Sequence, residues 1–279
     1  MSGSKIRSIA IVVLILINGL FLGLIISDAT EDARAQRESL ENISTILINR
    51  GIMISPDNIR TDSTIRAMRT ARAVEMEQTI ARVFLGDTVV TDQGVIFSHE
   101  NPEKGSALFY SAGHFGVRLN EGVITSESDS KRTVIRLLEQ MGLETDALVT
   151  VYNRDSNTEV ITVLSAYRGV SIFNCPIEFV FVGENLSSVD GRFVSGIEPI
   201  ENGAEISHVG AALLAFLSAV KDEDRHDVSC TEIFEVQAGF RYRGVGAAGE
   251  GVIDPAWRVR TDNGVFMIDD ATGEIWVLE

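Results

Sequence analysis

Histidine and cysteine, which many enzymes use as bases, nucleophiles and metal ligands, are scarce in this chain. Its 279 residues include four histidines and two cysteines. Neither cysteine has a CxxC partner, so a structural zinc site is not expected. The sequence contains no glycine-rich phosphate loop and no G-x-S-x-G nucleophile motif. We therefore expect no cofactor, no metal and no enzymatic activity.

The few stretches that concentrate titratable groups have simpler explanations. His99 lies in the turn-like sequence SHENP, which predicts a solvated loop. His114 lies in a strand-like stretch between glycines, and His208 stands at the start of a helix. Residues 224–227 (DRHD) could bind a divalent cation through carboxylates, but they follow a helix end and are more typical of a charged loop. A wall-directed hydrolase would need a deep pocket with paired carboxylates or a metal. In this sequence such a pocket would lie around His226.

Positive charge is scarce. The chain has 24 lysines and arginines against 40 aspartates and glutamates, a formal net charge of −16. This balance argues against nucleic acid as a partner, and against adhesion to anionic lipid or wall polymer through bulk charge. A high net charge also keeps a protein soluble, which is the simpler explanation.

A long uncharged run stands near the N-terminus, and the remainder has no second one. Residues 9–26 (IAIVVLILINGLFLGLII) would form a helix about 27 Å long, enough to cross a bilayer core. Lys5 and Arg7 precede the run and acidic residues follow it. The positive-inside rule then predicts that residues 1–8 are cytoplasmic and that the rest is extracytoplasmic. The chain is thus predicted to be a single-pass protein of the cell membrane that contacts the lipid bilayer through residues 9–26.

The alternative is a cleaved signal peptide. Residues 33–35 (Ala-Arg-Ala) have the small-x-small form of a cleavage site. The apolar run is longer than the apolar region of such peptides, and an acidic stretch separates it from residue 33. These two features favour an uncleaved anchor.

The predicted anchor contains the polar residue Asn18 and two glycines, Gly19 and Gly23. Glycines four residues apart share one face of a helix and let a second backbone approach closely. An amide inside the membrane gains from a hydrogen bond across that contact. The three residues predict recognition of another helix. The alternative is that glycine is simply common in membrane helices and that Asn18 bonds its own backbone.

Residues 27–50 are predicted to form a juxtamembrane helix or linker that ends at Gly51. A short heptad-like spacing joins Ala33, Gln36, Leu40, Ile43 and Leu47, and all of these except Gln36 are apolar. This face would pack either on the chain's own next domain or on a partner helix.

The remainder predicts an α+β fold. Three amphipathic or apolar segments predict helices at residues 73–85, 130–141 and 208–220. Period-two segments around and between them predict strands, the later ones at 148–152, 160–167, 177–182, 191–197, 233–242, 256–260, 265–269 and 274–278. The order predicts two extracytoplasmic units, residues 51–150 and 151–279, each an antiparallel sheet with a packed helix.

The two cysteines, Cys175 and Cys230, leave two alternatives open. Outside the cell they could form a disulfide, which would stabilise the chain by about 4 kcal/mol in the chain-entropy model. Two free buried thiols fit the sequence equally well, because a sparse pair does not define a disulfide framework.

Three stretches together resemble the YycH/YycI family of bacterial two-component-system regulatory proteins. The first is the anchor followed by ILINRGIMISPDNI (residues 46–59), and the second is AYRGVSIFNCPIEFVF (residues 166–181). The third is PAWRVRTDNGVFMIDDATGEIWVL (residues 255–278). The resemblance is loose over the whole chain and best at its two ends. The two cysteines and a glycine-rich acidic insert at residues 243–254 depart from it.

The resemblance implies a non-enzymatic, bitopic protein with α+β extracytoplasmic domains. It would regulate a membrane sensor histidine kinase that oversees cell-wall metabolism, in part through transmembrane contacts. A second YycH-like regulatory protein is a further partner of the kind the resemblance implies. An alternative is a tethered extracytoplasmic binding or inhibitor module, because residues 270–274 (DATGE) resemble the closing hairpin of PepSY-type domains. In that turn an aspartate begins the bend and Gly273 takes a positive φ.

Overall fold

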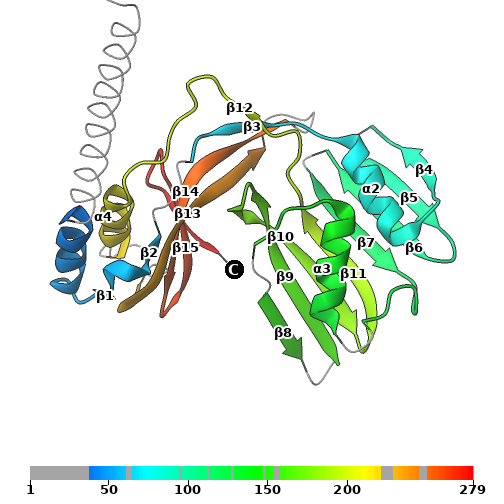
Figure 1. Cartoon of the computed structure of the whole chain (residues 1–279), viewed down its shortest axis with the longest axis horizontal. Helices are drawn as coiled ribbons and strands as arrows, with labels where there is room; N and C mark the ends of the chain where they lie inside the picture. The colour runs from blue at the N-terminus through cyan, green and yellow to red at the C-terminus, as the bar shows by residue number, and fades with distance from the viewer. Residues whose placement is uncertain are drawn as a thin grey trace, which may run out of the picture. The chain divides into compact units, whose positions relative to one another are not determined.

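The computed structural model of the chain contains two compact units, Met1–Pro56 and Asp57–Glu279 (Figure 1). The structure describes residues 38–60, 65–94, 96–111, 113–126, 129–146, 149–153, 157–220, 229–244 and 250–278. The predicted membrane span, residues 9–26, lies outside these ranges. Within them, no helix combines the length and the apolar character needed to cross a bilayer.

The three helices predicted at residues 73–85, 130–141 and 208–220 are observed within one residue of those bounds. Besides a helix at residues 38–48, the helices in the described part of the chain are η1 (Pro56–Asn58, a 3-10 turn), α2 (Val74–Leu85), α3 (Ser130–Met141) and α4 (Val209–Val220). The strands up to residue 153 are β1 (Met53–Ile54), β2 (Ile59–Arg60), β3 (Met68–Thr70), β4 (Val89–Asp92), β5 (Ile96–Asn101), β6 (Gly105–Tyr110), β7 (His114–Leu119) and β8 (Val149–Asn153). The later strands are β9 (Thr158–Tyr167), β10 (Val170–Val182), β11 (Asn185–Arg192), β12 (Glu198–Pro199), β13 (Glu232–Gly244), β14 (Gly251–Thr261), β15 (Gly264–Asp269) and β16 (Ile275–Leu278).

In the first unit, residues 38–48 form a helix. Ile43 and Leu47, two positions of the predicted apolar face, are buried, with 8% and 1% of their surface exposed. Gly51 lies in the turn that follows, at φ +86°, a backbone angle that glycine adopts without strain. The helix ends at residue 48, three residues before the glycine at which the sequence predicted its end. The N-terminal half of the predicted face lies outside the described residues.

In the second unit, a central antiparallel sheet has the strand order β4-β5-β6-β7-β11-β10-β9-β8. Helices α2 and α3 lie over one face of it (Figure 1). A single apolar cluster joins the two helices to β6, β7, β9, β10 and β11. Strands from both sides of residue 150 share this sheet, and the domain boundary at that residue stays a prediction.

The ends of α2 and α3 follow from local chemistry. The Asp129 carboxylate accepts a hydrogen bond from the Arg132 backbone N–H at 3.1 Å and caps α3. Gly142 ends α3 in the left-handed conformation at φ +68°, and Gly86 follows α2 at the same φ. The bounds predicted for α3 are therefore those observed.

The second, C-terminal sheet of this unit consists of β12, β3, β14, β13, β15, β16 and β2. Its strands pair antiparallel except that β13 runs parallel to β2 and to the start of β10. Helix α4 packs on its apolar face, where the rings of Phe216 and Phe266 lie 5.4 Å apart. The predicted class, α+β with mostly antiparallel sheet, is confirmed.

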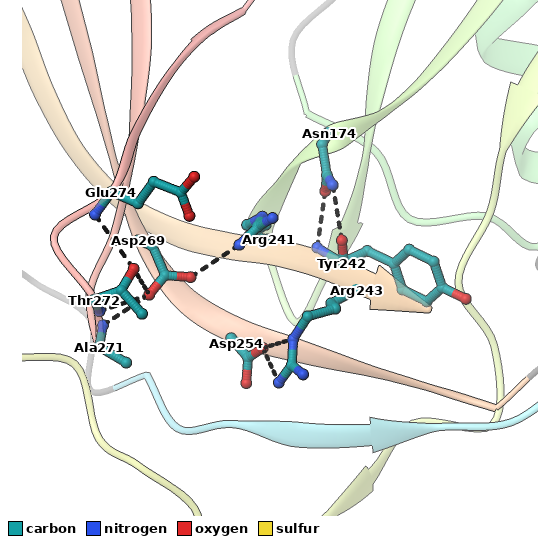
Figure 2. Close-up of polar contacts among 9 residues, drawn as sticks. All are labelled: Asn174, Arg241, Tyr242, Arg243, Asp254, Asp269, Ala271, Thr272 and Glu274. Atoms are coloured by element: carbon teal, nitrogen blue, oxygen red, sulfur yellow. Dashed lines mark hydrogen bonds and ion pairs between the residues drawn. The ribbon is translucent and has the colours of Figure 1, made fainter. Parts of the chain in front are cut away.

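Strand β10 belongs to both sheets. At its start Val170 and Ser171 pair with β9, and Ile172 pairs in parallel with Phe240 of β13. After an irregularity the strand pairs with β9 again from Pro176 and with β11 of the central sheet from Ile177. Asn174 lies between these two parts. Its side-chain amide bonds both the N–H and the C=O of Tyr242, each at 2.8 Å (Figure 2). A side chain thus continues the pairing with β13 where the backbone of β10 turns away.

The strand predicted at residues 191–197 is wrong. The strand observed there, β11, is Asn185–Arg192, because a tight turn with Gly183 at φ +60° starts it directly after β10. The pairing of β11 with β10 contains a register shift. The buried residues Leu186 and Val189 of β11 are therefore three positions apart and not two or four. The period-two signal of an ordinary strand is therefore absent from its sequence.

Candidate functional site

One face of the C-terminal sheet packs against α4, and the opposite face carries most of the charge of the sheet beside a small apolar cluster of Phe173, Ala256 and Met267. Even-numbered residues of β13 from Val236 to Tyr242 are buried. Side chains alternate along a strand, so the odd-numbered residues point to the other face. These odd-numbered residues are Glu235, Gln237, Gly239, Arg241 and Arg243.

Pairing with the neighbouring strands brings more arginines to the same face. Arg260 lies opposite Glu235 and Arg258 lies opposite Gln237. On the other side of β13, Arg60 of β2 pairs with Gln237. Directly opposed residues in a sheet share a face, so their side chains are neighbours. We call the part of this surface that β2, β13, β14 and β15 form the arginine face; its charged residues are Arg60, Glu235, Arg241, Arg243, Asp254, Arg258, Arg260 and Asp269.

At one end of the arginine face each guanidinium has its own carboxylate (Figure 2). Arg241 Nη1 lies 3.0 Å from Asp269 Oδ2, and its guanidinium carbon lies 3.8 Å from the ring centroid of Trp276. Arg243 donates from Nε and Nη2 to one oxygen of Asp254, at 3.1 and 2.9 Å. This end is therefore balanced in charge.

At the other end three guanidinium groups surround one carboxylate. Glu235 Oε1 lies 3.4 Å from Arg60 Nη2, and Glu235 Oε2 lies 3.5 Å from Arg260 Nε and 3.9 Å from Arg258 Nη2. The side chains of Arg60 and Arg260 are 68% and 54% exposed, whereas that of Glu235 is 16% exposed. We call these four residues the Glu235 cluster.

Aromatic rings support the arginines of the cluster. The Arg258 guanidinium lies over the ring of Phe173 at 5.2 Å. That ring in turn lies against Gly239, where an added Cβ would come within 2.3 Å of it. The Arg260 guanidinium lies 5.9 Å from the ring of Phe234, which is 40% exposed. Each ring favours a cation above its face and limits the rotamers that the guanidinium can adopt.

The arginine face as a whole has five arginines against three carboxylates, on a chain whose formal net charge is −16. Its excess positive charge lies in the Glu235 cluster, because the other end is paired one to one. A guanidinium presents its donors in a planar fork that matches a carboxylate or a phosphate. The arrangement can bind an anionic group.

A separate hollow lies between the two sheets, lined in part by Thr70, Arg72, Glu77, Ser195 and Tyr242. Its two ionic groups already bond each other, since Arg72 donates from Nε and Nη2 to the Glu77 carboxylate at 2.6 and 2.9 Å. Glu77 is 1% exposed. We therefore assign this pair a structural role.

The two cysteines are free thiols in this structure. Cys175 is buried in β10 and Cys230 is half-buried just before β13. Burial raises the pKa of Cys175 to about 12 and that of Cys230 to about 11. Neither thiol is set up as a nucleophile, because both stay protonated near neutral pH.

The loop predicted around His99 is wrong. His99 lies in β5 and is 3% exposed. Its Nδ1 lies 3.1 Å from the Thr88 hydroxyl, and its ring makes an edge contact with Phe109. Burial lowers the pKa of His99, while the nearby Glu77 carboxylate opposes that effect. The polar sequence SHENP is thus part of a strand whose histidine is satisfied in the core.

Among the described residues, the structure does not bring the other candidates from the sequence together in a site. His114 begins β7 and His208 precedes α4, and both are exposed. Residues 224–227 lie outside the described residues, as do Asn18, Gly19 and Gly23. Within the described ranges, no three His, Cys, Asp or Glu side chains are grouped so that they could hold a metal ion.

The closing hairpin forms a turn of the predicted kind, but the aspartate that accepts the backbone N–H groups is Asp269 and not Asp270. Gly273 has φ +70°, as predicted. Asp269, one residue before the predicted DATGE turn, accepts the backbone N–H groups of Ala271 and Thr272. Asp270 instead accepts the indole N–H of Trp257 at 3.0 Å. The hairpin is therefore held by the last residue of β15.

The arginines of the Glu235 cluster are not among the residues that sequence motifs indicate. The available signal for two of them was the alternation of arginine with buried residues in WRVR, residues 257–260. That alternation is common in half-exposed strands and specifies no function by itself.

Comparisons with known proteins define the fold further. No protein-family model matches the chain, and neither does any curated protein. Among solved structures, the chain is similar to an uncharacterized protein from Eubacterium rectale ATCC 33656, whose crystal structure was determined at 1.45 Å resolution. The similarity covers 79% of this chain and 89% of that chain, with 11% sequence identity and a TM-score of 0.50. At this identity the likeness concerns the fold alone.

Proposed function

We propose that the chain is a membrane-anchored, non-enzymatic regulator of a sensor histidine kinase, with its α+β units outside the cell. The observation that carries this proposal is the 18-residue uncharged run at residues 9–26, which follows Lys5 and Arg7 and precedes an acidic stretch. The resemblance of three stretches to the YycH/YycI family supports the kinase as the partner and cell-wall homeostasis as the process.

The membrane helix acts by contact with helices of the kinase. Gly19 and Gly23 supply a shallow groove, and Asn18 beside it supplies a hydrogen bond. Regulation requires that these contacts differ between the two signalling states of the kinase, because equal contacts shift no equilibrium. The outer units add a second contact, for which the Glu235 cluster is the best-developed surface.

The test uses the full-length chain in membranes. Replacing Gly19 and Gly23 together with leucine fills the groove, and should reduce co-purification of the kinase about tenfold, the effect of roughly 1.4 kcal/mol. The matched control replaces Ile17 and Phe21 with leucine, because these residues lie about half a turn from the glycine face. Circular dichroism of the outer units should be the same in all three proteins. Equal co-purification of the glycine variant and the native chain would contradict the proposal.

A second candidate is a tethered binding or inhibitor module that needs the membrane only for location. The observation that favours it is the PepSY-like closing hairpin, which Asp269 and Gly273 hold in a defined turn. Exchange of residues 1–27 for an unrelated anchor separates the two candidates. Such a chimera keeps full function if the chain is a tethered module, and loses kinase regulation if the anchor recognises its partner.

A further inference from the structure

We propose that the Glu235 cluster, together with Phe234, is the docking site for an acidic, extended segment of a protein partner. The inference rests on the proposed function, in that the partner is the protein which this chain regulates or assembles with. To the proposed function it adds the surface of the outer units that contacts the partner and the chemical character of the segment that binds there.

The cluster has donors that its own carboxylate does not use fully. Three guanidinium groups share Glu235, and the shortest of the three separations is 3.4 Å. Charge-assisted hydrogen bonds of this kind are ordinarily about 2.7–2.9 Å long. Arg60 and Arg260 are both more than half exposed. A second carboxylate can therefore approach these two arginines from solvent while Glu235 stays in place.

The neighbouring aromatic ring favours a peptide over a simple anion. Phe234 is 40% exposed and lies beside the Arg260 guanidinium. Arginine next to an aromatic ring is the combination enriched at the energetic centre of protein interfaces. Inorganic phosphate has no apolar part to cover the ring. A peptide with an apolar side chain next to its carboxylates covers both features.

The charge of the whole chain favours a short acidic segment over a long polyanion. The local excess of positive charge lies on a chain of formal net charge −16. Screening limits the reach of exposed charges to about 10 Å at 0.1 M salt. A segment of a few residues interacts mainly with the cluster, whereas a long anionic polymer would also meet the negative remainder of the surface.

The test measures binding of a fluorescein-labelled peptide, Glu-Glu-Phe-Glu-Glu-Phe, to the full-length chain in detergent by fluorescence anisotropy. The native chain should bind this peptide in a salt-sensitive manner and should not bind the version with lysine in place of glutamate. Arg260→Gln combined with Arg60→Gln should weaken binding at least about tenfold, because both exposed donors are removed. Phe234→Ala should weaken it about threefold or more, through lost contact with the phenylalanine of the peptide.

Arg243→Gln is the matched control. The Arg243 side chain is 55% exposed against 54% for Arg260, but it is paired one to one with Asp254. This variant should bind the peptide within about twofold of the native chain. Thermal melting checks that each variant is folded. If the variant with Arg260→Gln does not fold, Arg260→Lys replaces it in the binding assay. It keeps the charge, loses the planar fork and should weaken binding by a smaller factor.

Several results would overturn the inference. Absence of peptide binding by the native chain would do so, as would an equal loss in Arg243→Gln and Arg260→Gln. Equally effective competition by inorganic phosphate would show a site for simple anions, and binding of phosphatidylglycerol vesicles in preference to the peptide would show a lipid site. The peptide assay needs no kinase, so its failure is distinct from failure of the anchor variants to alter co-purification.

Discussion

The side-chain amide of Asn174 holds both backbone groups of Tyr242, with its nitrogen on the carbonyl and its oxygen on the N–H, each at 2.8 Å. It does so where β10 leaves the C-terminal sheet and enters the central sheet. Tyr242 is 6% exposed, so water is a poor substitute partner. One amide therefore replaces a missing stretch of strand pairing between the two sheets.

Replacement of Asn174 by alanine should destabilise the second unit by roughly 2 kcal/mol or more, because a buried N–H and a buried C=O both lose their partner. Asn174→Asp keeps an acceptor for the N–H and loses the donor to the carbonyl, so it should be destabilising as well. Urea unfolding of the native chain and both variants measures the effect. A stability unchanged within about 0.5 kcal/mol for Asn174→Ala would show that the amide is dispensable.

The pair Arg72–Glu77 should be one of the most sensitive to single substitution. Its side chains are 12% and 1% exposed, and two hydrogen bonds join them. Arg72→Leu leaves the Glu77 carboxylate buried without a counter-ion and should destabilise the chain by about 3–5 kcal/mol. Arg72→Leu combined with Glu77→Leu should recover most of that loss, because no charge then stays buried.

The exposed pair Arg66–Glu205 is the control for this prediction. Its side chains are 63% and 52% exposed. Arg66→Leu should change the free energy of unfolding by less than about 1 kcal/mol, as is usual for surface ion pairs. Equal effects of Arg72→Leu and Arg66→Leu would mean that burial does not govern these pairs.

His99 should make stability depend on pH near neutrality. Burial lowers its pKa in the folded state below the ordinary 6.5, so the unfolded chain takes up the proton first as the pH falls. The contribution of His99 is therefore complete above pH 6.5 and is lost progressively as the pH falls from that value through the folded-state pKa. Urea unfolding at intervals from about pH 8 to about pH 5 measures it. His99→Gln, which keeps a polar partner for Thr88, should flatten this part of the profile, and an unchanged slope would assign it to other groups.

The thiols should differ in accessibility. Cys175 is buried and Cys230 is half-buried, and burial raises the pKa of both, to about 12 and about 11. Under native conditions near neutral pH, a maleimide should label Cys230 slowly and leave Cys175 unmodified, whereas both react in denaturant. Peptide mass spectrometry without a reducing agent measures each site. A peptide with Cys175 and Cys230 joined would show that the chain forms the disulfide after all.

Much of the fold can be predicted from local patterns in the sequence. The helix at residues 130–141 has an acceptor at its start, a glycine at its end and one apolar stripe, and each signal agrees with the others. The strand β11 was misplaced, because its buried residues Leu186 and Val189 break the period of two. His99 was misassigned for a related reason, since a polar sequence in a strand resembles a turn until its neighbours are known.

The candidate site is not readable in the same way. Arg60 and Glu235 are 175 positions apart, and only the parallel pairing of β2 with β13 makes them neighbours. Nothing in the sequence near Arg60 indicates that pairing. The uneven charge of the Glu235 cluster also follows from the register of the sheet. Arg258 and Arg260 each have acidic residues nearby in the sequence, but both face Glu235 on the neighbouring strand.

The central claim is that residues 9–26 form a membrane helix that recognises its partner through Asn18, Gly19 and Gly23. The most direct measurement replaces this segment with leucines in the native gene and follows kinase-dependent gene expression in cells, with surface labelling to confirm equal amounts of the outer units. The account predicts that the all-leucine chain reaches the surface and fails to regulate the kinase. Normal regulation by that chain would contradict it.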